Sequence, residues 1–419
     1  MNVLHFICHD LGRQLNCYGD KSVTSPNIDA LAAEGVLFEN YFAASTPCSP
    51  SRGCIQTGKY AHSNGLIGLV NRGWDMQEEQ RSIVDYLNAA GYSTSHFGFQ
   101  HERKDTAKNR YGKEVSVGPT HIEAVVDKVV EHLKTEAAGS QPFYINAGTF
   151  EVHLPFDRDC YEEDDPETVF VPSYLPDNTD VRKELARFHG AIKYMDKHFG
   201  RIVDALKENG LIDDTIVIFT TDHGAAFPRA KSTLYDPGIG TALIMRFPES
   251  MNMKGRKKEL LSNIDLVPTL LDLLGLSIPE DIQGRSFHGL LIGGTYAERE
   301  DIFAEKNYHD SFDPVRCIRT RNFKFMRNYE PAPRIPLPVD IERSIASNTM
   351  WADAYDPHPP EELYDLDNDP AELNNLAEDS AYSELRNNLN ARLQQWMEDT
   401  DDPVLSGFAG IGVPPEQPT

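Results

Sequence analysis

Apolar segments of two kinds alternate along most of this chain. Short runs such as NVLHFIC (residues 2–8) and DTIVIFTTD (214–222) have the length and β-branched content of buried strands. The longer segments 121–136 and 184–210 carry apolar residues at helical spacing, and Gly210 is a natural stop for the second. This alternation predicts an α/β fold with a large, mostly parallel sheet flanked by helices.

Further segments continue the same alternation. Helix-to-strand units are expected at residues 25–40 and 82–98, and another strand at 142–149. Because α/β sheets place their ligand sites at the carboxyl ends of the strands, the polar residues that follow these strands are the first candidates for chemistry.

The pattern changes toward the C-terminus. An antiparallel strand pair, a strand with a turn and a closing helix are expected at 315–329, 361–377 and 383–399. We therefore expect a large α/β catalytic domain over residues 1–310 and a smaller α+β domain over residues 311–419. The proline-rich segment 329–340 is expected to be a loop that walls a pocket.

Composition and charge narrow the classes of protein that fit this pattern. With 419 residues, 40% of them hydrophobic and 25% charged, the chain has the composition of a folded globular protein. Its net charge of −25 repels nucleic acids and anionic membrane surfaces, which argues against both as partners. The first residues show no signal-peptide pattern, and no apolar run approaches the roughly 18 residues of a membrane span, so the sequence predicts a cytoplasmic protein. Oligomerisation is left open.

The six cysteines form no CxxC pair and no zinc-type spacing. This usage is compatible with a reducing compartment. Cys48 lies between two prolines and four residues before an arginine, and neither a CxxC pair nor a zinc site explains why a cysteine stands there.

Carboxylates and imidazoles follow the ends of the predicted strands. His9 and Asp10 come after the first strand, while Asp222 and His223 come after TIVIFTT. A single such carboxylate is usually a turn or cap residue, but two pairs at one sheet edge favour a divalent-cation site.

Two more histidines, His101 and His153, also follow strand-like segments. A lone histidine is more often a hydrogen-bonded structural residue. Their shared placement nevertheless makes them candidates for general acid and base catalysis.

The segment CSPSRGCIQTG, from Cys48 to Gly58, matches the signature C-x-P-S-R-x-x-x-x-T-G. In this respect the chain resembles the formylglycine-dependent sulfatases of the alkaline phosphatase superfamily. The resemblance implies that a separate formylglycine-generating or anaerobic maturing enzyme oxidises Cys48 to Cα-formylglycine, whose hydrated aldehyde is the nucleophile. If the stretch after Pro50 is helical, Arg52 lies one turn from Cys48 on the same face.

Other segments extend the resemblance over essentially the whole chain. Within the sulfatases, FPRAKSTLYDPG (227–238), PLPVD (336–340) and WMEDTDDPV (396–404) are most similar to the N-sulfoglucosamine sulfohydrolase, or sulfamidase, branch. Arg52 is then implied as a stabiliser of the nucleophile. The groups implied for sulfate binding, proton transfer or contact with the sugar are His101, His153, Lys231, Arg229, His309 and Arg316.

The resemblance also implies one divalent metal ion. Its ligands would be Asp10, Asp222, His223, the formylglycine at Cys48 and, less securely, His9. Family resemblance favours calcium, whereas two imidazoles leave manganese and zinc as alternatives.

Three departures from the family pattern change the expectations. His9 stands where sulfatases carry the first of two aspartates, so its role as a ligand is open. Phe99 replaces a lysine of the sulfate pocket, and Arg103, Lys104 or Arg229 is expected to supply the missing charge. Gln56 stands where leucine is common in the signature.

The favoured function is that of a sulfatase acting on a sulfated sugar, with the N-sulfate of glucosamine in heparan- or heparin-type saccharides as the preferred substrate. Three alternatives stay open: an O-sulfatase acting on another glycan or an aryl sulfate, a phosphonate or phosphate monoester hydrolase on the same fold, and a non-catalytic binder of sulfated glycans. The intact signature argues most strongly against the last.

Overall fold

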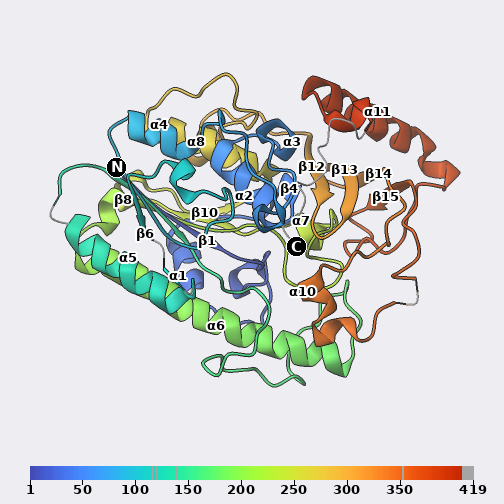
Figure 1. The fold of residues 1–419 in the computed structure, drawn as a ribbon, viewed down its shortest axis with the longest axis horizontal. Helices are drawn as coiled ribbons and strands as arrows, with labels where there is room; N and C mark the ends of the chain where they lie inside the picture. Colours follow the sequence, from blue (N-terminus) through green and yellow to red (C-terminus); the bar gives the residue numbers. More distant parts are fainter. Residues whose placement is uncertain (116, 119, 137–138, 352, 408–419) are drawn as a thin grey trace.

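An eight-stranded sheet forms the centre of the molecule (Figure 1). The structure is a computed structural model that describes residues 1–407 apart from 116, 119, 137–138 and 352. The strand order is β10-β2-β9-β8-β1-β7-β5-β6, and β9 alone among these strands runs antiparallel to its neighbours. The strands are β1 (Asn2–Cys8), β2 (Val36–Phe38), β5 (Ser93–Gly98), β6 (Lys113–Val115), β7 (Phe143–Gly148), β8 (Thr215–Thr221), β9 (Leu243–Arg246) and β10 (Gly255–Lys257). The predicted α/β fold with a mostly parallel sheet is confirmed.

Helices cover both faces of this sheet, as Figure 1 shows. One face packs against α1 (Pro26–Glu34), α5 (Ile122–Glu136) and α6 (Thr179–Glu208), and the other against α2 (Cys48–Thr57), α4 (Ile83–Ala89) and α8 (Leu266–Leu273). The helix expected at 184–210 begins earlier, at Thr179, because the side chain of Asn178 accepts hydrogen bonds from the first free backbone N–H groups.

A second, five-stranded sheet has the order β15-β14-β13-β12-β4. Its strands are β4 (Ser45–Thr46), β12 (Asp301–Tyr308), β13 (Phe312–Thr320), β14 (Phe323–Asn328) and β15 (Glu361–Asp365), and α11 (Ser383–Asp399) packs on it. The sheet thus begins at Asp301, ahead of residue 311, and it includes a strand from the N-terminal part of the chain. Residues 408–419 of the expected smaller domain lie outside the described residues.

Shorter elements complete the chain: α3 (Ala61–Asn64), α7 (Asp236–Ile239), α9 (His288–Leu291), α10 (Val339–Glu342), β3 (Tyr41–Phe42) and β11 (Leu261–Ser262). Across the described ranges, no helix combines the length and the apolar character needed to cross a membrane.

Candidate active site

The two predicted His/Asp pairs leave the sheet at the same edge. Strands β1 and β8 are parallel neighbours, with Cys8 opposite Thr221, so the residues that follow them emerge side by side. The backbone N–H of Asp10 donates to Asp222 Oδ1 at 3.0 Å, which ties the two strand ends together. Sheet topology therefore explains why residues more than 200 positions apart meet here.

The signature segment forms α2, whose first residue is Cys48. Gly58 ends the helix in the left-handed conformation, with φ 68°, which explains the glycine at the end of the signature. Ser51 Oγ donates to the carbonyl of Asp222, and Arg52 Nε donates to Asp222 Oδ2 at 3.1 Å. These two contacts hold the N-terminus of α2, and with it Cys48, against the strand ends.

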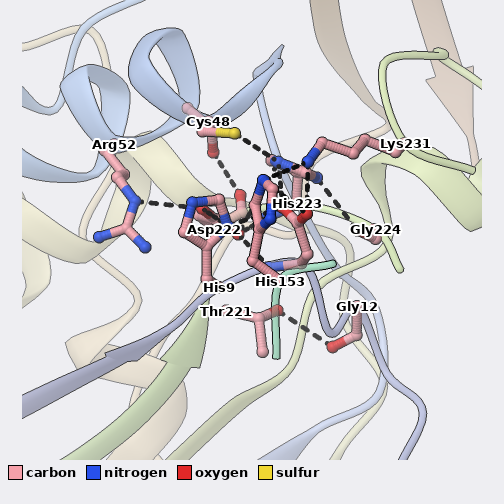
Figure 2. Close-up of polar contacts among 12 residues, drawn as sticks. His9, Gly12, Cys48, Arg52, His153, Thr221, Asp222, His223, Gly224 and Lys231 are labelled. Carbon is pink, nitrogen blue, oxygen red and sulfur yellow. Dashed lines mark hydrogen bonds and ion pairs between the residues drawn. The ribbon is translucent and has the colours of Figure 1, made fainter. Parts of the chain in front are cut away.

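Five ligand-type side chains converge at this point, and Figure 2 labels four of them: His9, Cys48, Asp222 and His223. His223 Nε2 lies 3.2 Å from Cys48 Sγ and 3.1 Å from Asp10 Oδ1. His9 Nδ1 lies 2.7 Å from Asp10 Oδ1 and 3.4 Å from Asp222 Oδ2. All five residues are buried, and their ligand atoms lie within 4.8 Å of one another. A single divalent ion fits this donor set.

The buried negative charges of the cluster favour the binding of a cation. Burial alone would lower the pKa of His9, but the negative charges of Asp10, Asp222 and Cys48 raise it to about 9. Burial would raise the pKa of the Cys48 thiol, whereas His9, His223 and other nearby cations bring it well below its usual range. Without a metal ion, the buried acids are thus balanced by imidazolium groups.

Lys231 connects this cluster to a second group of polar side chains. Its Nζ contacts Asp10 Oδ2 and Asp340 Oδ2 and donates to His153 Nε2 at 3.0 Å, which uses all three ammonium hydrogens. His153 Nδ1 donates to the carbonyl of Leu154 at 2.6 Å, so Nε2 is the acceptor. Burial and the charge of Lys231 lower the pKa of His153 to about 4, which leaves this imidazole neutral near pH 7.

Asp340 is a site residue that the sequence reasoning did not single out. It lies in α10, at the end of the proline-rich loop, and the sequence marks it only through the family resemblance of the segment PLPVD. Together with Val339 it brings that loop to the cavity, as predicted.

A cavity of about 320 Å³ opens onto Cys48, His9, His153 and Lys231. This volume suits a single sugar residue. Predicted residues His101 and His309 line the cavity, and so do the unpredicted Arg72, Arg343 and Asp310. Asp310 accepts hydrogen bonds from Arg72 Nη2 at 2.5 Å and from the backbone N–H of Val339 at 2.9 Å, so it joins two parts of the wall.

The cation that replaces the family lysine does not come from the expected residues. Arg103 donates to the carbonyl of Met76, Arg229 is buried against the ring of Tyr235, and neither they nor Lys104 lines this cavity. The arginines that do line it are Arg72 and Arg343.

Phe99 takes the position of that lysine with an apolar ring. Its ring centroid lies 4.9 Å from that of His9 and 5.0 Å from Cζ of Arg52. The ring therefore covers the guanidinium of Arg52 by a cation–π contact instead of adding a charge.

Arg316 is not placed to contact a substrate, which corrects the sequence-based expectation. It is fully buried on β13, where Nη2 donates to Asp402 Oδ1 at 2.9 Å and Nε contacts the other oxygen of the same carboxylate. Its role in this chain is to join the small sheet to the segment that follows α11.

We expect Arg316→Met to lower the free energy of unfolding by about 3–5 kcal/mol, because it leaves the buried carboxylate of Asp402 without its cationic partner. Thermal unfolding measures the loss, and adding Asp402→Asn should recover part of it. The kcat/KM of the folded enzyme should change little. A large loss of kcat/KM at unchanged stability would instead indicate that Arg316 contacts the substrate.

Comparisons with known families give two profile matches. The sulfatase family profile matches residues 1–276, and the profile for the C-terminal part of N-sulphoglucosamine sulphohydrolase matches residues 226–340. Human N-sulphoglucosamine sulphohydrolase is 29% identical over 473 residues, which cover 98% of this chain and 92% of the human protein. An ulvan-active sulfatase of Formosa agariphila is 28% identical over 448 residues, covering 94% of this chain and 74% of its own length.

Solved structures show the same fold. A protein solved in complex with its substrate, D-glucosamine-2-N,6-O-disulfate, superimposes with a TM-score of 0.73 at 19% identity, covering 96% of this chain and 98% of the other. Phosphonate monoester hydrolase of Agrobacterium radiobacter superimposes with a TM-score of 0.75 at 20% identity, covering 97% of both chains. At these identities the likeness is one of fold, and it does not choose between substrates.

Proposed function

We propose, from the premise that this chain belongs to the sulfatase family and is a hydrolase, that it removes the N-sulfate of glucosamine from heparan- or heparin-type saccharides. The match to the C-terminal profile of N-sulphoglucosamine sulphohydrolase supports this substrate. So does a cavity sized for one sugar, which favours attack on a terminal residue.

The observation that carries the proposal is the contact among Lys231, His153 and Asp340 beside the nucleophile position. Release of an amine from an N-sulfate requires a proton at nitrogen. His153 Nε2 receives a hydrogen bond from Lys231, so the pair can hold a proton at the place where the leaving group departs. A phenolate leaving group needs this proton far less.

Two groups absent from the sequence as translated complete the reaction. Sulfatases generally use a metal ion and a formylglycine, which together supply an activated oxygen nucleophile. In this chain Asp10, Asp222, His223 and His9 fit the metal ion, and Cys48 is the precursor of the aldehyde. Only the family resemblance favours calcium as that ion. A maturing enzyme is therefore a required partner.

The remaining residues orient the sulfate. Arg52 is buried, and its Nη2 has no hydrogen-bond partner within the described part of the chain, so it can donate to a sulfate oxygen or to the nucleophile. The N-terminus of α2 adds partial positive charge beside the anion. Arg72 and Arg343 place further positive charge at the cavity wall, where other acidic groups of the saccharide can bind.

The proposal is tested by offering glucosamine with a single sulfate at nitrogen, at oxygen 6 or at oxygen 3 and measuring sulfate release from each. We expect hydrolysis of the N-sulfate in preference to both O-sulfates. Turnover of an O-sulfate with the N-sulfate untouched would reject the proposed substrate and leave family membership standing.

A second candidate is hydrolysis of phosphonate or phosphate monoesters, because the sequence Asp222-His223-Gly224 also resembles that of related phosphonate hydrolases. Sulfate and phosphonate esters of one leaving group separate the two reactions. A higher kcat/KM for the phosphonate ester would favour the second candidate.

A further inference from the structure

His9, which joins His223 in the metal cluster, sets this chain apart from the site expected of its family, where an aspartate stands at this position. His9 and His223 each direct a ring nitrogen at the same carboxylate oxygen, Asp10 Oδ1, at 2.7 and 3.1 Å. Ligands of one ion at metal–ligand distances of about 2.1 Å stand roughly 3 Å apart when adjacent. Each of the two nitrogens is thus spaced from this oxygen as a neighbouring ligand of one small ion would be.

The hydrogen bonds around His223 are those of a metal ligand. Its Nδ1 lies 3.0 Å from the carbonyl of Gly224, and since a carbonyl only accepts, Nδ1 carries a proton. Nε2 faces Asp10 Oδ1 and Cys48 Sγ, and it becomes a ligand atom when a metal ion displaces the proton that it shares with this carboxylate. Metal-binding histidines commonly donate their other N–H to such a partner, which fixes the tautomer and the ring orientation.

The carboxylates of the cluster are held in the same way. Asp222 Oδ1 accepts from the backbone N–H groups of Asp10 at 3.0 Å and of His223 at 2.9 Å, and Arg52 Nε donates to Oδ2. Lys231 takes Oδ2 of Asp10, which leaves Oδ1 facing the imidazoles. The donor atoms are therefore fixed before an ion arrives.

The geometry points to a transition-metal ion, and we propose that this site selects zinc or manganese over calcium. This inference rests on the metal-dependent reaction proposed above. Calcium takes six to eight oxygen ligands at about 2.3–2.6 Å, whereas this cluster offers two imidazoles, two carboxylates and the side chain at position 48. Imidazole nitrogen binds zinc and other first-row transition ions more strongly than it binds calcium. His9 is the specificity-determining residue, because it replaces a carboxylate with a nitrogen donor.

The test measures metal selectivity directly. The full-length protein is freed of metal with a chelator, equilibrated with equal concentrations of Ca²⁺, Mn²⁺ and Zn²⁺, separated from free ions and analysed for metal content. We expect bound zinc plus manganese to exceed bound calcium by at least about 10-fold. In His9→Asp the ratio should move toward calcium by a similar factor.

Electron paramagnetic resonance of the Mn²⁺-loaded protein supplies a readout that does not depend on activity. Wild-type protein should show couplings to two imidazole nitrogens, and His9→Asn and His223→Asn should each lose one. Circular dichroism verifies that the variants are folded, and His9→Asn replaces His9→Asp if the added charge prevents folding.

Preferential retention of calcium by the wild type would overturn this inference. So would a spectrum in which both nitrogen couplings survive the replacement of His9. A calcium-loaded enzyme that hydrolyses the N-sulfate would reject the metal assignment and retain the proposed function. A protein that retains zinc or manganese and hydrolyses only O-sulfates would support the metal assignment and reject the proposed substrate.

Discussion

Replacing Cys48 with alanine is expected to lower sulfate release by roughly a millionfold, the scale of losing a nucleophile in a hydrolase. The side chain stands at the first position of α2, 3.2 Å from His223 Nε2, and the described structure offers no second cysteine in the cluster. Cys48→Ser should be nearly as inactive unless the host oxidises serine. Sulfate release per mole of folded protein gives the result.

Cys54→Ala provides a matched control. Cys54 is also buried and lies on the same helix, but it packs in the core beside the small sheet. Its replacement should preserve activity and metal content, and circular dichroism should be unchanged in both alanine variants. Mass spectrometry of the peptide containing Cys48, from a host with a maturing enzyme, should detect formylglycine. Substantial turnover by Cys48→Ala would refute the mechanism.

Replacing His153 with glutamine is expected to slow hydrolysis of N-sulfoglucosamine by about 10²–10⁴-fold while slowing an activated aryl sulfate much less. Glutamine keeps a polar group beside Lys231 but cannot carry the proton that a departing amine needs. The pKa of His153 lies at about 4, chiefly because of burial and the charge of Lys231, and a bound sulfate raises it by adding negative charge. Steady-state kinetics on both substrates measures the difference.

The pH profile supplies the second readout for His153. If the imidazolium is the acid, kcat for the N-sulfate falls as pH rises through its pKa in the complex, and His153→Gln removes that slope. His309→Gln is the comparison, because His309 lines the same cavity but is not among the contacts of Lys231. Equal losses on the N-sulfate and the aryl sulfate would show that His153 binds sulfate without protonating the leaving group.

Local sequence patterns were sufficient to predict the central strands of the large sheet, but not β6, β9 or β10. Strands β1 and β8 are continuous apolar runs because both of their faces are covered, and such runs are recognisable without knowledge of their neighbours. The two-residue strand β4 could not be predicted, since it is too short for any periodicity and exists only because β12 lies beside it.

The candidate site divides in the same way. His9, Asp10, Asp222 and His223 could be predicted to meet because they follow parallel strands. The role of Asp340 could not be predicted, since only loop packing brings it to Lys231. The pairing of Arg316 with Asp402 could not be predicted either, because the two residues are 86 positions apart. A charged residue in a segment that resembles the family is a candidate functional residue. Only its contacts in the structure show whether it binds a substrate or stabilises the fold.

The pairing of β4 with β12 has a consequence for the order of events during synthesis. Ser45 donates to the carbonyl of Glu305, 260 residues further along the chain. At 5–20 residues per second, a ribosome needs roughly 13–50 s to produce that partner after Ser45. Throughout this time the strand that leads directly into Cys48 lacks its neighbour. The maturing enzyme proposed above would thus have roughly 13–50 s in which to reach a thiol that the finished fold encloses.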